Sequence, residues 1–383
     1  MPDPRPIAAF LDEHHHALAA EYADFARSHI KRLPEPENDD AARVQAREIL
    51  KVLGAADFFK PIAEADLRAC CLAREALGAA SPLADSVFAL QGLGSLPVFL
   101  GGSEALKERW FRPAMAGELM AGFAMTEPQA GSDLSAMATR AVRDGDHYVL
   151  NGQKTLISNA GIADFYSVFA VSDPSQGLRG LSCFVVPADT PGLVFKGPQV
   201  LSAPHPLGEL VFEDCRIPSE NLLGSEGQGF KLGMSALDRL RPTVGAAACG
   251  MGARALEEAM SYALKREQSG RPIAQFQLVQ EKIAVMATEL TASRLLVFRA
   301  GWEKDHGKDR ISLEAAMGKS YATEAAQKII DDSIQIHGGV GLLANHPVDR
   351  LYRSIRALRV YEGTTEILRL TIGKMLLKEA AAE

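Results

Sequence analysis

The spacing of the apolar residues changes twice along this chain, and these two changes limit the folds that it can adopt. Up to about residue 115 the sequence is rich in alanine and leucine, as in the run from Leu67 to Leu77, which is typical of helices. From about residue 117 to 222, short β-type runs alternate with the turn dipeptides Asp144-Gly145 and Asn151-Gly152. From Gly229 the helical spacing returns and continues to the C-terminus. The pattern predicts an α+β protein in the order helical, β, helical.

The three regions also predict three domains, with bounds at residues 1–116, 117–225 and 226–383. Residues 166–171, 183–186 and 210–212 are the clearest strand candidates of the middle region, which favours a small antiparallel barrel or sandwich. In the last region Val279, Ile283, Met286 and Leu290 follow one another at spacings of four, three and four residues. That spacing places them on one helix face and favours a helix bundle.

Composition excludes several classes of partner. The chain has 383 residues and a formal net charge of −7, which gives no electrostatic reason to expect nucleic acid or an anionic membrane. We find no apolar stretch near the roughly 18–20 residues needed to cross a bilayer, and acidic residues stand where a signal peptide needs a basic start. The five cysteines form no CxxC pair, as in reduced cytoplasmic proteins. We therefore expect a cytoplasmic protein without a membrane or nucleic-acid partner.

Several short segments have both a structural and a functional interpretation. The run from Phe123 to Asp133 is a polar turn that could bring N–H groups and hydroxyls to a ligand, or a simple connecting loop. The glycine-rich run 335–341 follows a helical stretch and is no Rossmann fingerprint. Glu362 before Gly363 is, taken alone, a turn residue. The three histidines 14–16 point in different directions on a helix, so we expect no metal site.

Four segments, taken together and in this order, resemble the acyl-CoA dehydrogenase family: residues 123–133, 266–277, 335–339 and 360–366. The resemblance covers most of the chain. It implies an N-terminal helical domain, a middle antiparallel β-barrel domain and a C-terminal four-helix bundle, with FAD as cofactor.

By this resemblance two groups of residues would hold FAD. The group along the flavin ring is Phe123, Met125, Thr126, Gly131, Ser132, Leu156 and Ser158, with Ser158 near flavin N5 and Leu156 where relatives often have an aromatic residue. The group at the pyrophosphate and adenine of an FAD bound mainly by another subunit is Arg266, Gln268, Phe276, Gln277, Gln335, Gly338 and Gly339. Thr364 and Glu366 match further FAD contacts, although Glu366 replaces a common glutamine.

The same resemblance places the catalytic base at Glu362. Some family members carry the base just before the arginine matched by Arg241, but here that residue is Leu240, which cannot accept a proton. The α-C–H of a thioester is weakly acidic, so a desolvated carboxylate suits the task. The residues implied at the substrate are Ser132, Asp238, Arg241, Tyr361 and Gly363.

The implied reaction is α,β-dehydrogenation of an acyl-CoA, with hydride transfer to FAD and electrons passed on to electron-transfer flavoprotein. Family members are commonly homotetramers. Residues 86–100 carry no charge, which favours a neutral acyl group, while residues 201–208 depart from the family pattern and leave the substrate open. Three alternatives remain: a dehydrogenase of carrier-protein-bound thioesters, a flavin oxidase or monooxygenase, and a binding scaffold without turnover.

Overall fold

The computed structural model describes residues 2–382, and the chain divides into two compact units. We call them the sheet unit, with residues Glu35–Glu64 and Ser86–Leu240, and the bundle unit, with residues Met1–Pro34, Ala65–Asp85 and Arg241–Glu383. The predicted order of a helical, a sheet-rich and a helical region is confirmed.

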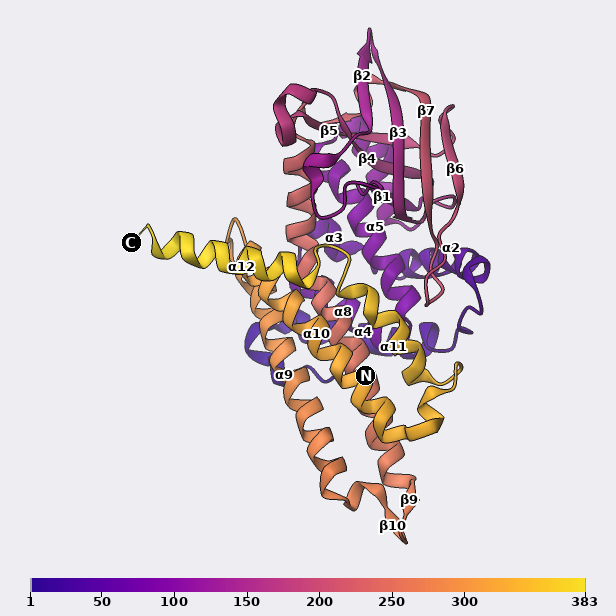
Figure 1. Ribbon diagram of the computed structural model, residues 1–383, viewed down its shortest axis with the longest axis vertical. Coiled ribbons are helices and arrows are strands. Elements are labelled where there is room, and N and C mark those ends of the chain that lie inside the picture. The colour runs from indigo at the N-terminus through magenta and orange to yellow at the C-terminus, as the bar shows by residue number, and fades with distance from the viewer. Residues whose placement is uncertain (1, 383) are drawn as a thin grey trace. The chain divides into compact units, whose positions relative to one another are not determined.

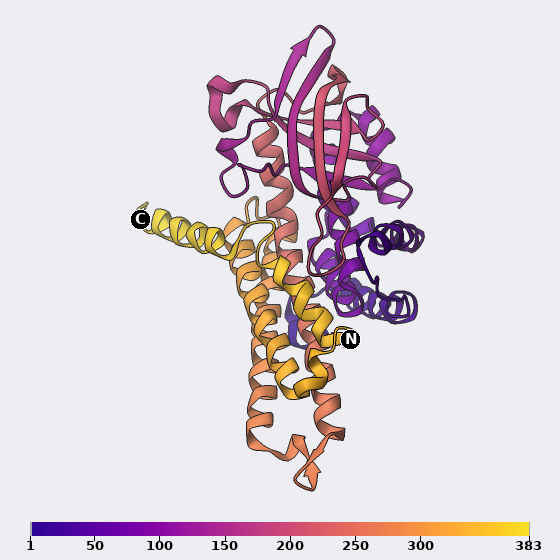
Figure 2. The same cartoon turned by 45° about the vertical axis from the view of Figure 1, so that its right-hand side comes forward.

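The sheet unit is built around one sheet, whose strand order is β6-β7-β3-β2-β4-β5-β8, with β1 paired to β4 (Figures 1 and 2). Neighbouring strands in this sheet are antiparallel, except that β1 and β2 both run parallel to β4. The strands are β1 (Ala121–Ala124), β2 (Arg140–Asp144), β3 (His147–Ser158), β4 (Phe165–Val171), β5 (Leu181–Pro187), β6 (Leu193–Pro198), β7 (Leu207–Pro218) and β8 (Leu222–Leu223). Its helices are α2 (Asp39–Ala55), α3 (Lys60–Glu64), most of α5 (Pro82–Gly101), α6 (Glu104–Leu106) and α7 (Arg112–Met115).

One of the two predicted turns is confirmed and the other is wrong. Asp144-Gly145 lies in the turn between β2 and β3, with Gly145 at φ +63°. Asn151-Gly152 instead lies inside β3, at a register shift against β7. Gly152 has φ +150°, and a Cβ there would lie 2.5 Å from Thr139 Oγ1. The glycine therefore serves a bulge and a close approach rather than a hairpin.

Helix α5 is longer and more apolar than the sequence analysis predicted for any segment of this chain. It has 20 residues and is by length and composition apolar enough to cross a membrane, so the expectation that no stretch reaches that length is wrong. However, 78% of its most apolar window is buried inside the protein. Leu93 and Leu96 pack against Leu237 and Leu240 within the sheet unit, as expected for a core helix.

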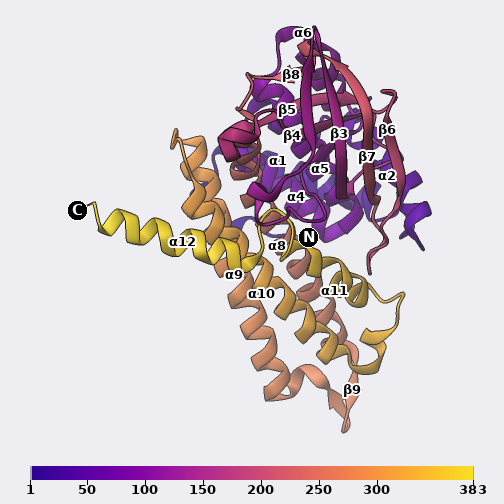
Figure 3. The ribbon, with the colours of Figure 1, turned by 45° about the horizontal axis from the view of Figure 1, so that its top comes forward.

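In the bundle unit α10 packs against α9, α11 and α12 (Figures 1 and 3). The helices are α1 (Glu13–Phe25), α4 (Leu67–Ala80), most of α8 (Gly229–Lys265), α9 (Gln277–Asp305), α10 (Ser312–His337), α11 (Pro347–Leu358) and α12 (Thr365–Ala380), and a hairpin of β9 (Glu267–Gln268) and β10 (Arg271–Pro272) joins α8 to α9. A Cβ at Gly250 would lie 2.1 Å from the Glu75 carbonyl oxygen. Helices α4 and α8 thus approach so closely that only glycine fits there.

Candidate active site

The turn that carries Glu362 lies between α11 and α12 and has a left-handed backbone. Glu362 has φ +53° and Gly363 has φ +101°. A left-handed conformation costs about 1 kcal/mol for a residue other than glycine, so the surrounding structure must hold it. Thr364 ends the turn by capping α12, since its side chain accepts a hydrogen bond from the N–H of Ile367 at 3.3 Å.

Two cationic side chains hold the carbonyl groups of this turn. Arg241 Nε from α8 donates to the Glu362 carbonyl at 3.1 Å, and Lys319 Nζ from α10 donates to the Gly363 carbonyl at 2.7 Å. Arg241 was among the residues that the resemblance implies at the substrate, whereas Lys319 was not predicted. The two contacts fix the orientation of consecutive peptide groups, and thereby the direction of the Glu362 side chain and of its peptide N–H.

One oxygen of the Glu362 carboxyl group is buried although the residue as a whole is half-buried. This atom, Oε2, is almost completely removed from solvent and accepts no hydrogen bond from residues 2–382. Burial raises the pKa of this carboxyl above its usual value, and the cations of Arg74, Arg241 and Lys319 oppose that rise. A desolvated carboxylate with a raised pKa and an unoccupied acceptor oxygen is a competent proton acceptor.

Behind Glu362 lies a buried ion pair that the sequence did not reveal. Arg74 on α4 donates two hydrogen bonds to Asp85, at 2.7 and 2.8 Å, and one to Thr243 Oγ1 at 3.0 Å. Both side chains of the pair are 1% exposed. The only sequence signal is that Arg74 stands, with Glu75 and Arg68, in a helical run made mostly of alanine, leucine and cysteine, and that signal does not identify the partner of Arg74.

Lys319 gives a prediction about pH. Replacing Lys319 by Met removes a cation that lowers the pKa of Glu362, so the Glu362 pKa should rise. A base with a higher pKa ionises at higher pH, so the acid limb of kcat/KM should move to higher pH, by about half a pH unit or more. The measurement is the pH profile of kcat/KM for substrate oxidation. Lys328→Met, an exposed lysine on the same helix, is the control and should leave the limb in place. An unchanged limb in the Lys319 variant would refute the coupling.

The same lysine should affect stability at alkaline pH. Burial lowers the pKa of Lys319 to about 8, although Glu362 nearby favours the ammonium form. Between pH 8 and the unfolded pKa of about 10.4, the unfolded chain binds the proton and the folded chain does not. Stability contributed at this position therefore rises with pH in that window, and Lys319→Met should lack this rise in urea unfolding.

The residues predicted along the flavin ring lie together in the sheet unit. The N–H of Thr155 donates to the Thr126 carbonyl at 3.0 Å, and Asn159 Nδ2 donates to the Ala121 carbonyl at 2.9 Å. These two bonds align residues 121–126 with the end of β3, so Phe123, Met125 and Thr126 lie beside Leu156 and Ser158. Gly131 and Ser132 lie in the exposed loop that follows, and Asp238 lies on α8 one turn before Arg241.

Leu156 presents an unusual surface. It has φ +55° and its side chain is 54% exposed, while its N–H donates to Gln199 Oε1 at 2.7 Å. An exposed leucine on a left-handed residue beside hydroxyl groups offers an apolar face with a polar edge. A flavin ring has the same combination, so these residues fit the predicted cofactor.

A buried ion pair supports this strand edge. Lys154 Nζ contacts Glu127 Oε1 at 2.7 Å and the Met125 carbonyl at 3.1 Å. Glu127 Oε1 also accepts the N–H of Thr139 at 3.0 Å. Burial lowers the pKa of Lys154 to about 8, although Glu127 favours the charged form. The pair ties β3 to the turn after β1 and was missed because each partner alone is an ordinary charged residue.

The residues predicted at the FAD pyrophosphate lie at one end of the bundle unit. The rings of Tyr262 and His337 are 4.5 Å apart, which brings the end of α8 to the end of α10. Arg266, Gln268, Gln277, Gln335, Gly338 and Gly339 are exposed there, and Phe276 lies under the Arg271 guanidinium. Lys319 and Gln335 are sixteen residues apart on α10, or roughly 24 Å along the helix. This group is therefore remote from Glu362 within the bundle unit.

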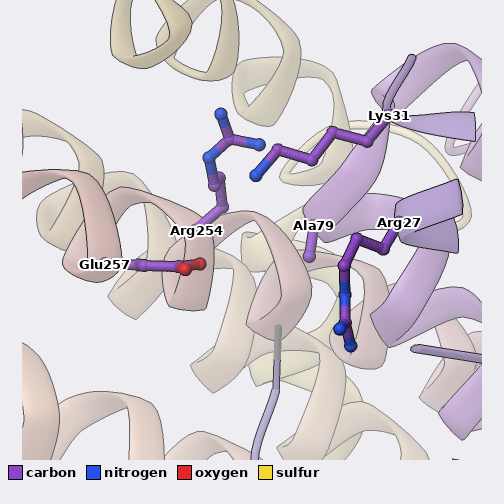
Figure 4. A pocket seen from close by; sticks show the side chains of 5 residues that line it. All are labelled: Arg27, Lys31, Ala79, Arg254 and Glu257. Atoms are coloured by element: carbon purple, nitrogen blue, oxygen red, sulfur yellow. The ribbon is translucent and has the colours of Figure 1, made fainter. Parts of the chain in front are cut away.

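Two other polar clusters lie in the bundle unit outside the predicted site. A surface pocket of about 270 Å³ is lined by Arg27, Lys31, Ala79, Arg254 and Glu257 (Figure 4). His14 and His15 each contact Asp66 at 3.1 Å, and His15 Nδ1 also accepts the N–H of Asp12 at 3.1 Å. Both ring nitrogens of His15 are thus engaged within the protein, and the absence of a metal site stays a prediction.

Comparison with known proteins identifies the family. Three family descriptions match in order: "Acyl-CoA dehydrogenase, N-terminal domain" at residues 12–118, "middle domain" at 122–215 and "C-terminal domain" at 227–377. The chain belongs to the acyl-CoA dehydrogenase family. It is 36% identical to a 3-(aryl)acrylate reductase of Clostridium sporogenes, over 96% of this chain and 100% of the relative. It is 39% identical to a cyclohex-1-ene-1-carbonyl-CoA dehydrogenase of Syntrophus aciditrophicus, over 90% and 85%.

Solved structures agree with this assignment. A chain in the electron transferring flavoprotein structure from Acidaminococcus fermentans is 36% identical, with a TM-score of 0.91 over 96% of this chain and 98% of that chain. A glutaryl-CoA dehydrogenase of Mycobacterium smegmatis, solved with FADH2, is 29% identical, with a TM-score of 0.87 over 96% of both chains. The predicted three-domain fold, the oxidoreductase class and FAD as cofactor are thereby confirmed.

Proposed function

We propose that this acyl-CoA dehydrogenase converts an acyl-CoA to the 2-enoyl-CoA, with Glu362 as the base that removes the α-proton. The observation that carries the proposal is the Glu362 carboxylate: its Oε2 is buried and accepts no hydrogen bond from residues 2–382, and its turn is held by Arg241 of α8 and Lys319 of α10.

The peptide N–H of Glu362 has a complementary role. It makes no hydrogen bond within residues 2–382, so it is available to hold the thioester oxygen while the α-proton leaves. A donor at this oxygen stabilises the charge that develops in the transition state. Tyr361 and Gly363 flank the base, and Asp238 and Arg241 match places on the substrate side.

FAD, when bound, accepts the hydride that leaves the β-carbon. Thr126, together with Leu156 and Ser158 at the end of β3, would hold its ring, with Phe123, Met125 and Ser132 beside them. Arg266 suits the pyrophosphate because its guanidinium donates two aligned hydrogen bonds. Gln268, Phe276, Gln277, Gln335, Gly338 and Gly339 would complete that end of the site, and Thr364 and Glu366 would add contacts near Glu362.

The proposed partners are electron-transfer flavoprotein and further copies of the chain in a homotetramer. Helix α12 has no buried residue after Leu368, and Leu370 and Leu377 are 56% and 74% exposed. An apolar helix face of this kind suits a subunit interface. The distance between the pyrophosphate group and Glu362 within one bundle unit also favours FAD shared between subunits.

A single experiment tests the function. Protein purified with FAD is mixed anaerobically with a panel of saturated acyl-CoA thioesters, and the loss of oxidised flavin absorbance is followed. We expect at least one thioester to bleach the flavin and to yield its 2-enoyl product. A protein that binds no FAD, or whose flavin is bleached by no acyl thioester, would overturn the proposal.

The uncharged helix segment 86–100 gives a substrate prediction. If it lines the acyl pocket, a terminal carboxylate would be buried there without a cationic partner, which costs several kcal/mol. We therefore expect kcat/KM for pentanoyl-CoA to exceed that for glutaryl-CoA by about 100-fold. The two thioesters have the same carbon number and differ by the terminal carboxylate. A clear preference for glutaryl-CoA would show that a cation reaches the pocket.

A second candidate is the same reaction in reverse, the reduction of an unsaturated thioester. The 36% identity to a 3-(aryl)acrylate reductase along the whole of that relative favours it. Glu362 would then deliver the α-proton, and its raised pKa suits both directions. Reoxidation of prereduced enzyme by an aryl-substituted enoyl thioester, faster than the forward bleaching, would favour this candidate.

A further inference from the structure

A histidine lies against the end of β3, the strand that carries Leu156 and Ser158. The segment 201–208 enters β7, and Leu207 pairs in register with Ser158 at the end of β3. Two residues earlier, His205 Nε2 lies 2.8 Å from Ser158 Oγ. Ser158 is the hydroxyl that the proposed function places at the flavin, so this contact lies directly behind it.

The position of His205 is fixed by the protein itself. Asp39 Oδ1 on α2 accepts a hydrogen bond from the peptide N–H of His205 at 3.3 Å, and the peptide N–H of Asn159 donates to the Pro206 carbonyl at 2.6 Å. Arg43 on α2 donates to the carbonyls of Ala160 and Leu207 at 2.6 and 2.5 Å. These bonds hold both sides of the His205–Ser158 contact, so the imidazole does not depend on a ligand for its place.

The imidazole is neutral at physiological pH. Burial, and then the neighbouring Arg43 guanidinium, lower the pKa of His205 to about 4. A neutral imidazole has one donor and one acceptor nitrogen. The Ser158 hydroxyl has a single proton, so Nε2 either accepts that proton or donates to its oxygen. In the first case the hydroxyl proton points at His205, and in the second it points away from His205 and is left for another acceptor.

This direction matters for a flavin. The N5 atom of oxidised flavin accepts a hydrogen bond, whereas in reduced flavin N5–H donates one. A hydroxyl whose proton is committed to His205 can only accept from N5–H, and a hydroxyl that receives a bond from His205 can donate to N5. Fixing the proton therefore favours one oxidation state over the other.

We propose that His205 is a positioning residue that orients the Ser158 hydroxyl and thereby sets the balance between oxidised and reduced flavin in this enzyme. The proposal rests on the proposed function, in which Ser158 contacts the flavin. It assigns a role to the segment in which this chain departs from the family pattern.

The test is the equilibrium ratio of reduced to oxidised flavin, in full-length protein with bound FAD, during stepwise anaerobic reduction by dithionite against a reference dye. His205→Leu removes the hydrogen bond and should change the ratio about two- to tenfold, as expected for one net hydrogen bond. His205→Gln keeps a polar nitrogen at the reach of Nε2 and should restore most of the wild-type ratio. His147→Leu, at the opposite end of β3, is the matched control and should not change it.

The decisive comparison uses Ser158→Ala. In that background His205→Leu should leave the ratio unchanged, because the hydroxyl through which it acts is absent. An equal change in both backgrounds, or no change with Ser158 present, would overturn the proposal. Dithionite needs no acyl substrate. A wild-type protein whose flavin no acyl thioester bleaches would therefore refute the proposed function, while the dye equilibrium would still decide the role of His205.

Discussion

Replacing Glu362 by Gln should leave FAD bound and lower the rate of flavin reduction by substrate about 1,000-fold or more. General-base catalysis accelerates a reaction by about 10²- to 10⁴-fold. The alternative position of the base in the family holds Leu240 here, so no second carboxylate can replace Glu362. Glutamine keeps the shape of the side chain, so the loss should come from the missing proton acceptor rather than from the turn. The measurement is stopped-flow bleaching under anaerobic conditions, together with the FAD content of the purified variant.

The control for this experiment is Glu379→Gln, an exposed glutamate near the end of α12. It removes the same charge and should bleach at the wild-type rate. Normal bleaching by the Glu362 variant would show that the base lies elsewhere. Loss of FAD from the variant would show instead that Glu362 holds the turn for cofactor binding.

The second large effect should come from the buried pair behind the site. Asp85→Asn leaves the Arg74 guanidinium in the protein interior without its counter-charge, and breaking such a pair costs about 3–5 kcal/mol. Burial would lower the pKa of Arg74, but Asp85 beside it more than compensates, so the guanidinium is charged in the folded state. We expect a large decrease in the free energy of unfolding of the bundle unit, measured by urea denaturation.

Two comparisons make the result specific. The double variant Arg74→Met with Asp85→Leu replaces both charges by apolar groups and should recover most of the lost stability. Asp24→Asn breaks the Arg27–Asp24 pair, whose side chains are 61% and 80% exposed, and should cost less than about 1 kcal/mol. If the double variant is as unstable as the sum of its single variants, Arg74 and Asp85 do not act as a pair.

The sequence predicted much of this protein because the relevant signals are local. Helical and strand periods depend on near neighbours, and the order of helical, sheet-rich and helical regions was predicted correctly. The prediction failed at Asn151-Gly152, which favours a tight turn locally but forms a bulge in β3. Pairing with β7 and the close approach of Thr139 decide the conformation there. The prediction also failed at α5, where we expected no apolar stretch long enough to cross a membrane. The helix has 20 residues and is this apolar because most of it is buried in the core.

The residues around the proposed base fall into two groups, those that stand in motifs and those that are distant along the chain. Glu362, Arg241 and Gly363 stand in recognisable motifs, so the sequence by itself determined the family and the reaction class that these residues imply. The pKa of Glu362 depends on the charges of Arg74, Asp85 and Lys319, which are far away along the chain and stand in no recognisable motif. Only the tertiary structure decided that Arg241 and Lys319 hold this turn, that Glu362 Oε2 is buried, and that His205 lies against Ser158. The physical reason is that each residue type has its own side-chain chemistry, whereas burial and charge pairing arise only when distant segments of the chain pack together.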